Sequence, residues 1–266
     1  MAADRSTTTG PDPTEARGRG RRRASHSLDT VLGEAIAILD ESGEPALTFR
    51  ALAARLGGGV ASIYWYVASR DELLERATEE VMGRVVAETE PLTHGPDPIA
   101  NVRAIALALF DEFVRRPWFG QLMLRNNGLQ PHSMLMFDRL GQQLMKLDLT
   151  PRQRFHAVSS IVSYVVGVAV DLAQPPPREF LESGMEPREF LTMYADRWRA
   201  LDPDGYPFAH QVAEEFATHD DLEVFRSGLD LLLDGLRLQA ALEITLTDDE
   251  IQRLEAPYTT QPAYWW

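Results

Sequence analysis

The stretch that decides the fold reads TFRALAARLG at residues 48–57, VASIYWYV at residues 60–67 and SRDELL at residues 69–74. Thr48 is a suitable N-cap for a short helix with Leu52 and Leu56 on one face, and the three glycines at 57–59 break that helix. A second short helix is predicted over residues 61–67. Two short helices joined by a tight glycine turn form a helix-turn-helix, whose second helix can enter the major groove of DNA.

Flanking helices must brace this pair, because a helix of about seven residues does not stand alone in water. Ser27 caps a preceding helix whose apolar residues recur at helical spacing as far as Leu39, and Gly43 ends it. Ser69 and Glu72 form a capping box that opens a longer helix after the motif. The residues expected to face this support are Leu52, Leu56, Ile63 and Val67. The residues predicted to contact DNA are Thr48, Arg50, Gly59, Val60, Ala61, Ser62, Tyr64, Tyr66 and Arg70.

Charge is distributed unevenly along the 266 residues, whose formal net charge is −14. Residues 1–67 carry eight Arg and eight Asp or Glu, whereas residues 68–266 carry 18 Lys and Arg against 32 Asp and Glu. An acidic body with a locally basic N-terminal region can present that end alone to phosphates. Residues 1–26 are too polar to pack, so they are predicted to form a disordered basic arm, either idle or lying along DNA. The arginines of this arm are Arg17, Arg19, Arg21, Arg22 and Arg23.

The rest of the chain is predicted to be helical, because its apolar residues recur with a period near 3.6 and no stretch alternates with period two. The fold class is therefore all-α, with about nine or ten helices. The expected divisions are a disordered arm at 1–26, a three-helix DNA-binding domain at 27–67, a larger helical domain at 68–242 and a C-terminal tail at 243–266.

Several classes of protein are disfavoured by the composition. The absence of cysteine excludes disulfides, thiolate nucleophiles and Cys-based metal sites. The N-terminus lacks the apolar segment of a secretory signal, and the longest uncharged apolar run, residues 157–170, is shorter than the roughly 20 residues that a bilayer requires. The six histidines lack metal-ligand spacing, and no catalytic set of residues is recognisable. We therefore expect a cytoplasmic protein that is not an enzyme and holds no metal or cofactor.

The helix-turn-helix region resembles the TetR family of transcriptional regulators. The resemblance lies in the pattern Thr-x-Arg-x-Leu-Ala-x-x-Leu-Gly, followed by Tyr-Trp-Tyr-Val and Arg-Asp-Glu-Leu-Leu. Residues 140–173, with the helix start Thr150-Pro151-Arg152, resemble the C-terminal domain of tetracycline repressors. The resemblance implies a ligand-responsive regulator, expected to be a repressor, that binds a palindromic operator. Without it, a packed helical hairpin with surface tyrosines remains the alternative for this segment.

The resemblance also implies a homodimer in which residues 150–173 and 221–240 form a four-helix bundle with their mates. From the residues alone, the first of these helices is apolar nearly all round, as expected where one side meets a partner. A helix that crosses the middle of a monomer is the alternative. The predicted interface residues are Val158, Val162, Val165, Val166, Ala169, Leu229, Leu232, Leu233 and Leu236.

A small-molecule effector is expected to bind in this same ligand-binding and dimerisation domain, at residues 68–242. Aromatic and methionine side chains there could line an apolar pocket, although some of them belong to the plain core. His156, near the start of a buried helix, is expected to be either a satisfied interior histidine or a ligand contact. The predicted pocket residues are Phe110, Phe113, Trp118, Leu122, Met123, Met134, Phe137 and His156.

One departure from the family bears on the effector. Tetracycline repressors hold the drug and its magnesium with His and Asn, but a gapless count places Val86, Ala104 and Leu122 there. His94 and Asn101 are the nearest candidates, in contexts that do not match. The expected effector is therefore a hydrophobic small molecule and not a magnesium–tetracycline chelate. An α-helical enzyme and an architectural DNA-binding protein without an effector are the alternative functions.

Overall fold

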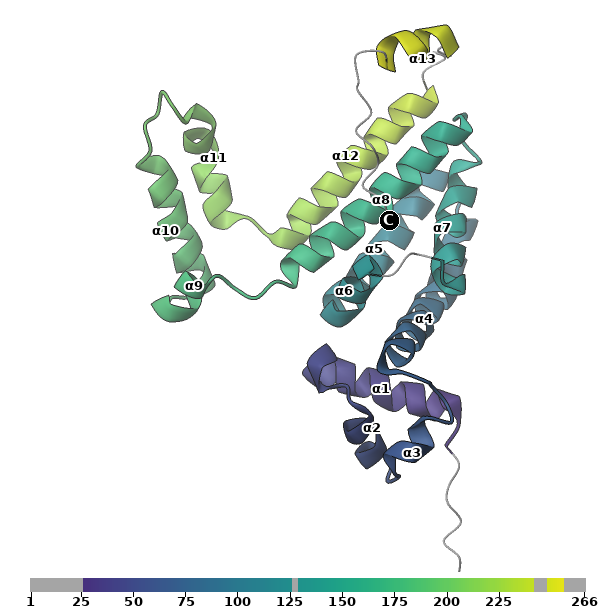
Figure 1. The fold of residues 1–266 in the computed structure, drawn as a ribbon. Helices are drawn as coiled ribbons and strands as arrows, with labels where there is room; N and C mark the ends of the chain where they lie inside the picture. Colours follow the sequence, from purple (N-terminus) through teal and green to yellow (C-terminus); the bar gives the residue numbers. More distant parts are fainter. Residues whose placement is uncertain (1–25, 126–128, 242–247, 256–266) are drawn as a thin grey trace, which may run out of the picture.

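The fold is all-α, as predicted (Figure 1). This computed structural model describes residues 26–125, 129–241 and 248–255. Within these ranges there are thirteen α-helices, two 3-10 helices and no strand. The number exceeds the nine or ten predicted because proline or glycine starts or ends short helices, such as α6 (Pro117–Arg125) and α9 (Arg178–Ser183), that periodicity alone does not separate.

An N-terminal head contains the helix-turn-helix. Its elements are α1 (Leu28–Ser42), η1 (Glu44–Ala46), α2 (Phe49–Arg55) and α3 (Val60–Ile63). The predicted caps form: the hydroxyls of Ser27 and Thr48 accept hydrogen bonds from the backbone N–H groups of Thr30 and Ala51, both at 3.1 Å. Gly57 has a φ of 65°, a left-handed conformation that glycine adopts without steric cost, and it turns the chain after α2.

A helical body follows the head and is connected to it by the long helix α4 (Arg70–Thr89) (Figure 1). Its other elements are η2 (Glu90–His94), α5 (Pro98–Arg115), α6, α7 (Pro131–Leu144), α8 (Pro151–Leu172) and α12 (Asp221–Ala241). Both predicted helix starts are present: Ser69 accepts from the Glu72 N–H at 3.0 Å, and Thr150 and Gln153 form a capping box. Helix α5 lies at the centre and packs against α4, α6, α7, α8 and α12.

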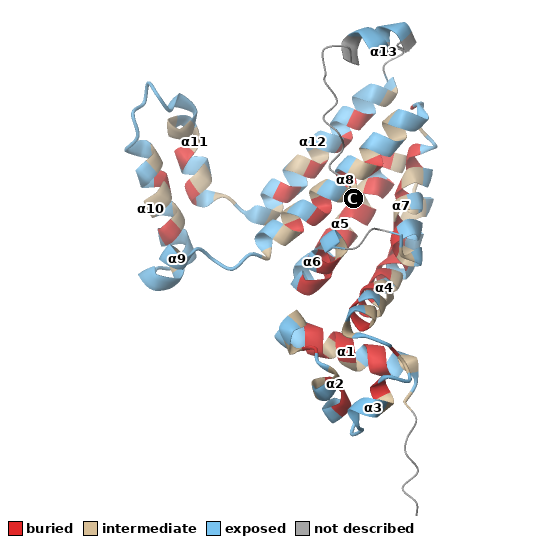
Figure 2. Cartoon of the chain, in the orientation of Figure 1, coloured by how far each residue is buried: buried red, intermediate tan, exposed pale blue. Residues whose placement is uncertain are grey.

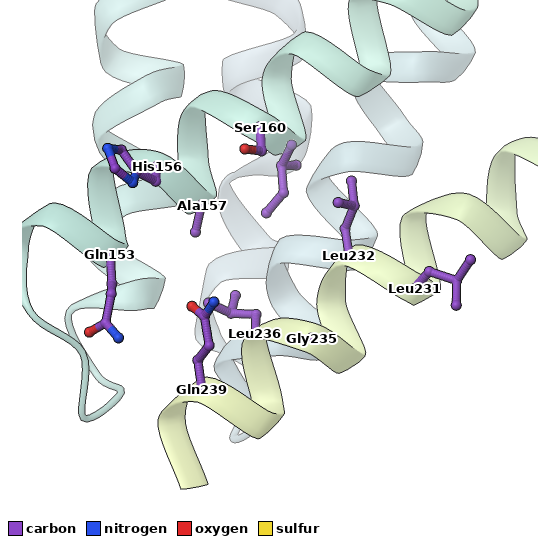
Figure 3. Close-up of a pocket in the computed structure, with 10 residues that line it drawn as sticks. Gln153, His156, Ala157, Ser160, Leu231, Leu232, Gly235, Leu236 and Gln239 are labelled. Carbon is purple, nitrogen blue, oxygen red and sulfur yellow. The ribbon is translucent and has the colours of Figure 1, made fainter. Parts of the chain in front are cut away.

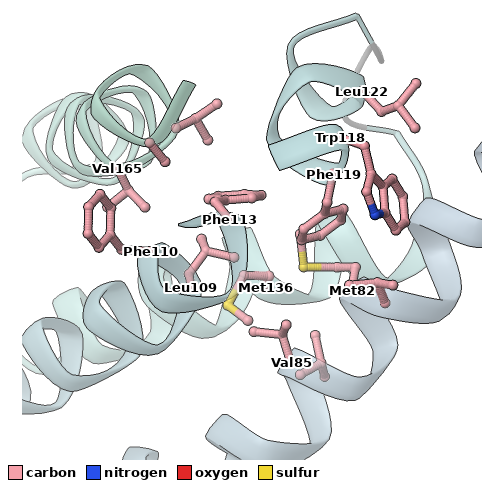
Figure 4. Packing of buried hydrophobic residues seen from close by; sticks show 14 of the residues in the cluster. Met82, Val85, Leu109, Phe110, Phe113, Trp118, Phe119, Leu122, Met136 and Val165 are labelled. Atoms are coloured by element: carbon pink, nitrogen blue, oxygen red, sulfur yellow. The ribbon is translucent and has the colours of Figure 1, made fainter. Parts of the chain in front are cut away.

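One continuous apolar core runs through the head and the body (Figure 2). In the body it is mainly aliphatic and contains several aromatic rings, among which Phe110, Phe113 and Phe119 are at most 2% exposed (Figure 4). Burial of each such side chain contributes about 1.5–3 kcal/mol. Helix α8 is long and apolar enough to cross a membrane by length and composition, but here it packs against α5, α6 and α12.

A lateral hairpin, formed by α9, α10 (Pro187–Arg199) and α11 (Pro207–Thr218), leaves the body between α8 and α12 (Figure 1). The prolines at 175–177 follow the end of α8 as predicted. The hairpin has a small apolar cluster of its own, in which the rings of Trp198 and Phe216 stack with centroids 4.2 Å apart. A last helix, α13 (Asp248–Glu255), falls in the region predicted as a C-terminal tail.

Candidate nucleic-acid interface and dimerisation face

The outer surface of the head is formed by α3 and the turn that follows it. Ile63, in α3, is 1% exposed, whereas the next two residues, Tyr64 and Trp65, are 58% and 87% exposed. Successive helical residues are rotated by about 100°, so neighbours of a buried residue point outward. Large exposed aromatic side chains side by side are typical of a binding surface.

Tyr64 is held against α2 by Phe49. The two ring centroids lie 4.9 Å apart at an interplanar angle of 82°, an edge-to-face contact worth about 0.5–1.5 kcal/mol. Phe49 is half-buried, and the next residue, Arg50, is exposed. A cation and a phenol hydroxyl are therefore both exposed in the α2–α3 unit.

Seven residues of the predicted DNA-contacting set are exposed or half-exposed in the α2–α3 unit. Two of their hydroxyls have structural roles, because Thr48 caps α2 and the Ser62 hydroxyl donates to the Gly59 carbonyl at 2.6 Å. The seven residues are Thr48, Arg50, Gly59, Val60, Ala61, Ser62 and Tyr64.

The other two predicted DNA contacts, Tyr66 and Arg70, are directed into the protein. The Tyr66 hydroxyl donates to the carbonyl of His26, and its half-buried ring packs against the core. The Arg70 guanidinium donates to the carbonyls of Leu47 at 2.8 Å and Glu44 at 2.6 Å. Tyr66 has this position because α3 ends at Ile63 and the turn after it directs the ring toward the core. The Arg70 side chain is 38% exposed, and contact of either residue with DNA stays a prediction.

Trp65 is the exposed residue that the sequence analysis left without a role. A helix continued through Val67 gives no reason to prefer Trp65 over its neighbours. The actual end of α3 at Ile63 leaves the indole in solvent. The signal available in the sequence was the presence of three aromatic residues in a row, Tyr64, Trp65 and Tyr66, because a helix that ends there cannot bury all of them.

A shallow groove lies between α8 and α12 on the surface of the body (Figure 3). It is lined by Gln153, His156, Ala157, Ser160, Ile161, Leu231, Leu232, Gly235, Leu236 and Gln239. Three of these residues are small, Ala157, Ser160 and Gly235, and a Cβ atom added at Gly235 would meet no atom within 4 Å. Leu231 and Leu238, on the same helix, are 75% and 65% exposed. This face therefore has small residues, which would let another helix approach closely, and exposed leucine side chains.

Most of the predicted interface residues are buried against the rest of the chain, although Leu236 also borders the groove. Val158, Val165, Val166, Ala169, Leu229, Leu233 and Leu236 are at most 6% exposed and belong to the core of the chain itself. Only Val162 and Leu232 stay partly accessible, Leu232 at 37%. The correction has a simple cause: both helices are apolar on two sides, and the more uniformly apolar side packs against α5.

The predicted pocket residues are divided between core and surface. Phe110, Phe113, Trp118 and Leu122 are at most 5% exposed (Figure 4). Phe110 stacks on Phe225 of α12 with centroids 3.6 Å apart. Met123 and Phe137 are half-buried at the edge of this core, whereas Met134 is 44% exposed. His156 is exposed in the groove, which rules out the first of its two expected roles, the interior histidine, and leaves the ligand contact as a prediction (Figure 3). The aromatic residues thus form packed core in this structure.

Asn101 and His94 have local structural roles. The Asn101 amide donates to the carbonyl of Gly95 at 2.9 Å and to the Gln143 side chain at 3.0 Å, which fastens η2 to α5 and α7. His94 is exposed and lies 3.6 Å from Glu90. Among the residues that the structure describes, no three His, Asp or Glu side chains cluster in a way that could hold a metal ion.

Comparison with known proteins agrees with this architecture. Residues 90–240 match the family model for the tetracyclin repressor-like C-terminal domain. The chain is 29% identical over 223 residues to the HTH-type transcriptional repressor DrrR1 of Streptomyces coeruleorubidus, covering 81% of this chain and 78% of the relative.

Solved structures extend the likeness across head and body. A TetR regulator from Streptomyces coelicolor, SCO7222, superposes with a TM-score of 0.68 at 32% identity, covering 81% of this chain and 99% of the other. The S. coelicolor TetR family protein ActR, in a complex with actinorhodin, has the same TM-score at 24% identity, covering 82% of this chain and 98% of the other. With the family model matching more than half of the residues, the chain belongs to the TetR family of transcriptional regulators.

Proposed function

We propose that this chain is a repressor that binds a palindromic operator as a homodimer and is released by a hydrophobic small molecule. The observation that carries the proposal is the division of the α2–α3 unit into two sides. Leu52 and Ile63 are buried in the head, while Arg50, Tyr64 and Trp65 are exposed. A helix-turn-helix presents its recognition helix in this way to the major groove.

Each exposed side chain has a plausible partner on DNA. Arg50 and the Tyr64 hydroxyl suit phosphate oxygens, which position the protein, whereas Val60 and Ala61 are small enough to let α3 approach base edges. Trp65 would cover sugar or a thymine methyl and lose its solvent-exposed area on binding. The predicted basic arm, Arg17 to Arg23, lies outside the described residues and stays a prediction.

Substitutions in the head should separate DNA binding from folding. Tyr64→Phe removes one hydroxyl and should cost about 1 kcal/mol of operator affinity, the scale of one hydrogen bond, without a change in melting temperature. Arg50→Ala and Trp65→Ala should also weaken binding while the protein stays folded. Binding is measured by fluorescence anisotropy on duplexes selected from random DNA.

Ile63→Ala is the control for these variants, because it leaves a cavity in the core of the head. It should lower the free energy of unfolding by about 2–5 kcal/mol. Any loss of operator affinity in this variant would follow from that loss of stability and not from a lost contact with DNA. Wild-type operator affinity in both Tyr64→Phe and Arg50→Ala would show that this surface does not read DNA.

Homodimerisation is proposed through the groove face of α8 and α12. A single helix-turn-helix per chain can fill one half-site only, so a palindrome requires two chains with their recognition helices about 34–36 Å apart. The groove offers Ser160 and Gly235 for close helix approach, together with uncovered Leu231 and Leu238. A symmetric interface needs such a self-complementary patch.

The effector is proposed to bind in the body among Phe110, Phe113 and Trp118. These rings give an apolar aromatic environment suited to a hydrophobic, planar ligand. Their side chains are at most 5% exposed, so a ligand that binds among them would displace them, and that displacement would shift the chain toward a state with lower operator affinity. ActR, which has a similar fold, forms a complex with actinorhodin, and that compound is therefore the first probe.

Actinorhodin at micromolar concentration is expected to release this chain from its operator, as measured by anisotropy of labelled duplex. Tetracycline with magnesium should do little, because Asn101 is engaged with Gly95 and Gln143 and aliphatic residues stand at the expected ligand positions. Release by magnesium–tetracycline would contradict this assignment.

The packed body also favours a second candidate, a DNA-binding protein without an effector. That function requires no cavity and no displacement of core side chains. Failure of actinorhodin and of a panel of other hydrophobic planar compounds to change either operator affinity or melting temperature would favour it.

A further inference from the structure

Two buried side-chain oxygens near the start of α7, where that helix meets α4, have no hydrogen-bond partner within the described ranges. They are Oε2 of Glu79 and Oε1 of Gln130. A buried acceptor without a donor is costly, so such atoms in a folded protein require an explanation, and a ligand supplies one. We propose that these oxygens bind the protonated amine of an aromatic effector. The inference rests on the proposed function and names the chemical class of the effector.

Glu79, on α4, uses one of its two carboxylate oxygens in the fold. Its Oε1 accepts the backbone N–H of His132, in the first turn of α7, at 2.6 Å. The His132 Nδ1 lies 2.6 Å from the same oxygen but is not aligned for a hydrogen bond. Among the residues described here, no Lys or Arg side chain forms an ion pair with Glu79. The carboxylate is therefore fixed by α7, and its Oε2 is available to a cation.

Gln130 supplies the second acceptor. It is half-buried and is the N-cap residue of α7, two residues before His132. Its side chain makes no cap hydrogen bond, and its Oε1 is buried without a donor. A carboxylate oxygen and an amide oxygen are both acceptors, so neither satisfies the other. An ammonium group carries three N–H donors and suits both.

The imidazole of His132 marks the place for the aromatic part of such a ligand. Its ring packs on Gly83, where an added Cβ atom would lie 3.0 Å from Cε1. The His132 side chain is 44% exposed, so solvent borders it on one side, and its rotation outward would uncover Gly83. Gly83 is four residues after Glu79, and residues at this spacing share one side of a helix. A flat ring on the glycine thus places an attached ammonium group beside Glu79.

This site borders the apolar core of the body. Met82, three residues after Glu79, is buried in that core (Figure 4). Ser133, next to His132, is also buried, and its hydroxyl lies 3.9 Å from the sulfur of Met123 on α6. An amine bound at Glu79 therefore stands at the edge of the core, where a hydrophobic ring attached to it can be buried. The expected effector is a hydrophobic aromatic compound that carries an amine.

Calorimetric titration of the full chain with two probes of the same shape tests the proposal. Naphthylmethylamine carries a protonated amine at neutral pH, whereas naphthalenemethanol carries a hydroxyl in its place. The amine should bind about tenfold more tightly, because hydrogen bonds between charged groups are stronger than those of a neutral hydroxyl. Equal affinities would mean that solvent satisfies the two oxygens. That result, or no binding of either probe at millimolar concentration, would overturn the proposal.

Glu79→Gln removes the charge with little change of shape and leaves an amide oxygen to accept the His132 N–H. The preference for the amine should disappear, while the affinity for the alcohol stays. Glu80→Gln is the matched control, because it removes the same charge one residue away, from a side chain that is 44% exposed and pairs with Arg84. This control should keep the preference. Equal losses in the two variants would show that the net charge of −14 attracts the amine without a site.

Gly83→Ala tests the position of the ring independently of the charge. The added methyl group narrows the space on α4 that both probes are expected to use. Both affinities should therefore fall by a similar factor, with the preference for the amine retained. Circular dichroism shows whether each variant is folded. Unchanged affinities of both probes in a folded Gly83→Ala chain would contradict this placement.

Release from the operator is a separate measurement, made by anisotropy of labelled duplex. Binding of the amine through Glu79 without any change in operator affinity would leave the site in place and contradict the effector part of the proposed function. Release by neutral planar compounds, with no preference for an amine at Glu79, would retain the proposed function and overturn this inference.

Discussion

Phe225→Ala is expected to lower the free energy of unfolding by about 3–5 kcal/mol. Phe225 is fully buried and lies between two other rings, with centroids 3.6 Å from Phe110 and 5.5 Å from Tyr164. The three rings come from α12, α5 and α8, so the cavity would open where three helices of the body meet. Urea unfolding at one fixed protein concentration measures the loss, since dimerisation makes apparent stability depend on concentration.

The matched control is Phe155→Ala, the same substitution at a side chain that is 60% exposed on α8. Its ring centroid lies 6.4 Å from that of the half-buried Phe137 and 6.0 Å from that of the exposed His156. The expected loss is below about 1 kcal/mol. Similar losses for the two variants would mean that the stack of Phe225 contributes little beyond ordinary surface packing.

Gly235→Arg is expected to abolish dimerisation at micromolar concentration. Gly235 lies in the groove of α8 and α12, and its missing Cβ faces open space, so arginine should not disturb the folded chain. Against a second copy the same side chain would bury an unpaired charge at a cost of at least about 3 kcal/mol, which weakens association more than a hundredfold. Sedimentation velocity should show a monomer, and operator affinity should fall with it.

Gly141→Arg provides the control for helix propensity and added charge. Gly141 lies on α7, and a Cβ there would also meet nothing within 4 Å. This variant should remain a dimer with wild-type operator affinity. If Gly235→Arg also sediments as a dimer, the self-association face lies elsewhere on the chain.

Much of the head could be predicted from the sequence because its signals are local. Ser27, Thr48 and Ser69 each accept the backbone hydrogen bond that an N-cap makes, and Gly57 takes the left-handed conformation that the turn requires. The spacing of Leu52 and Ile63 likewise identified the buried side of the motif. These features depend on a few neighbouring residues and not on distant parts of the chain.

The assignment of sides on α8 and α12 could not be predicted in the same way. Both helices carry apolar residues over most of their circumference, so periodicity does not say which side meets α5 and which stays exposed. Val165 and Leu233 are buried in the chain itself, while Ser160 and Gly235 lie in the groove. Only the packing of several helices against one another settles such a choice.

By itself, then, the sequence determined the all-α class, the helix-turn-helix and most of the helix starts, because caps, glycine turns and apolar spacing act over a few residues. Tertiary structure alone decided that Tyr66 and Arg70 point inward, that Trp65 is exposed, and that Asp40 and Glu44 bind α6. Those outcomes join residues that are dozens of positions apart. They follow from where whole helices pack, which no local pattern encodes.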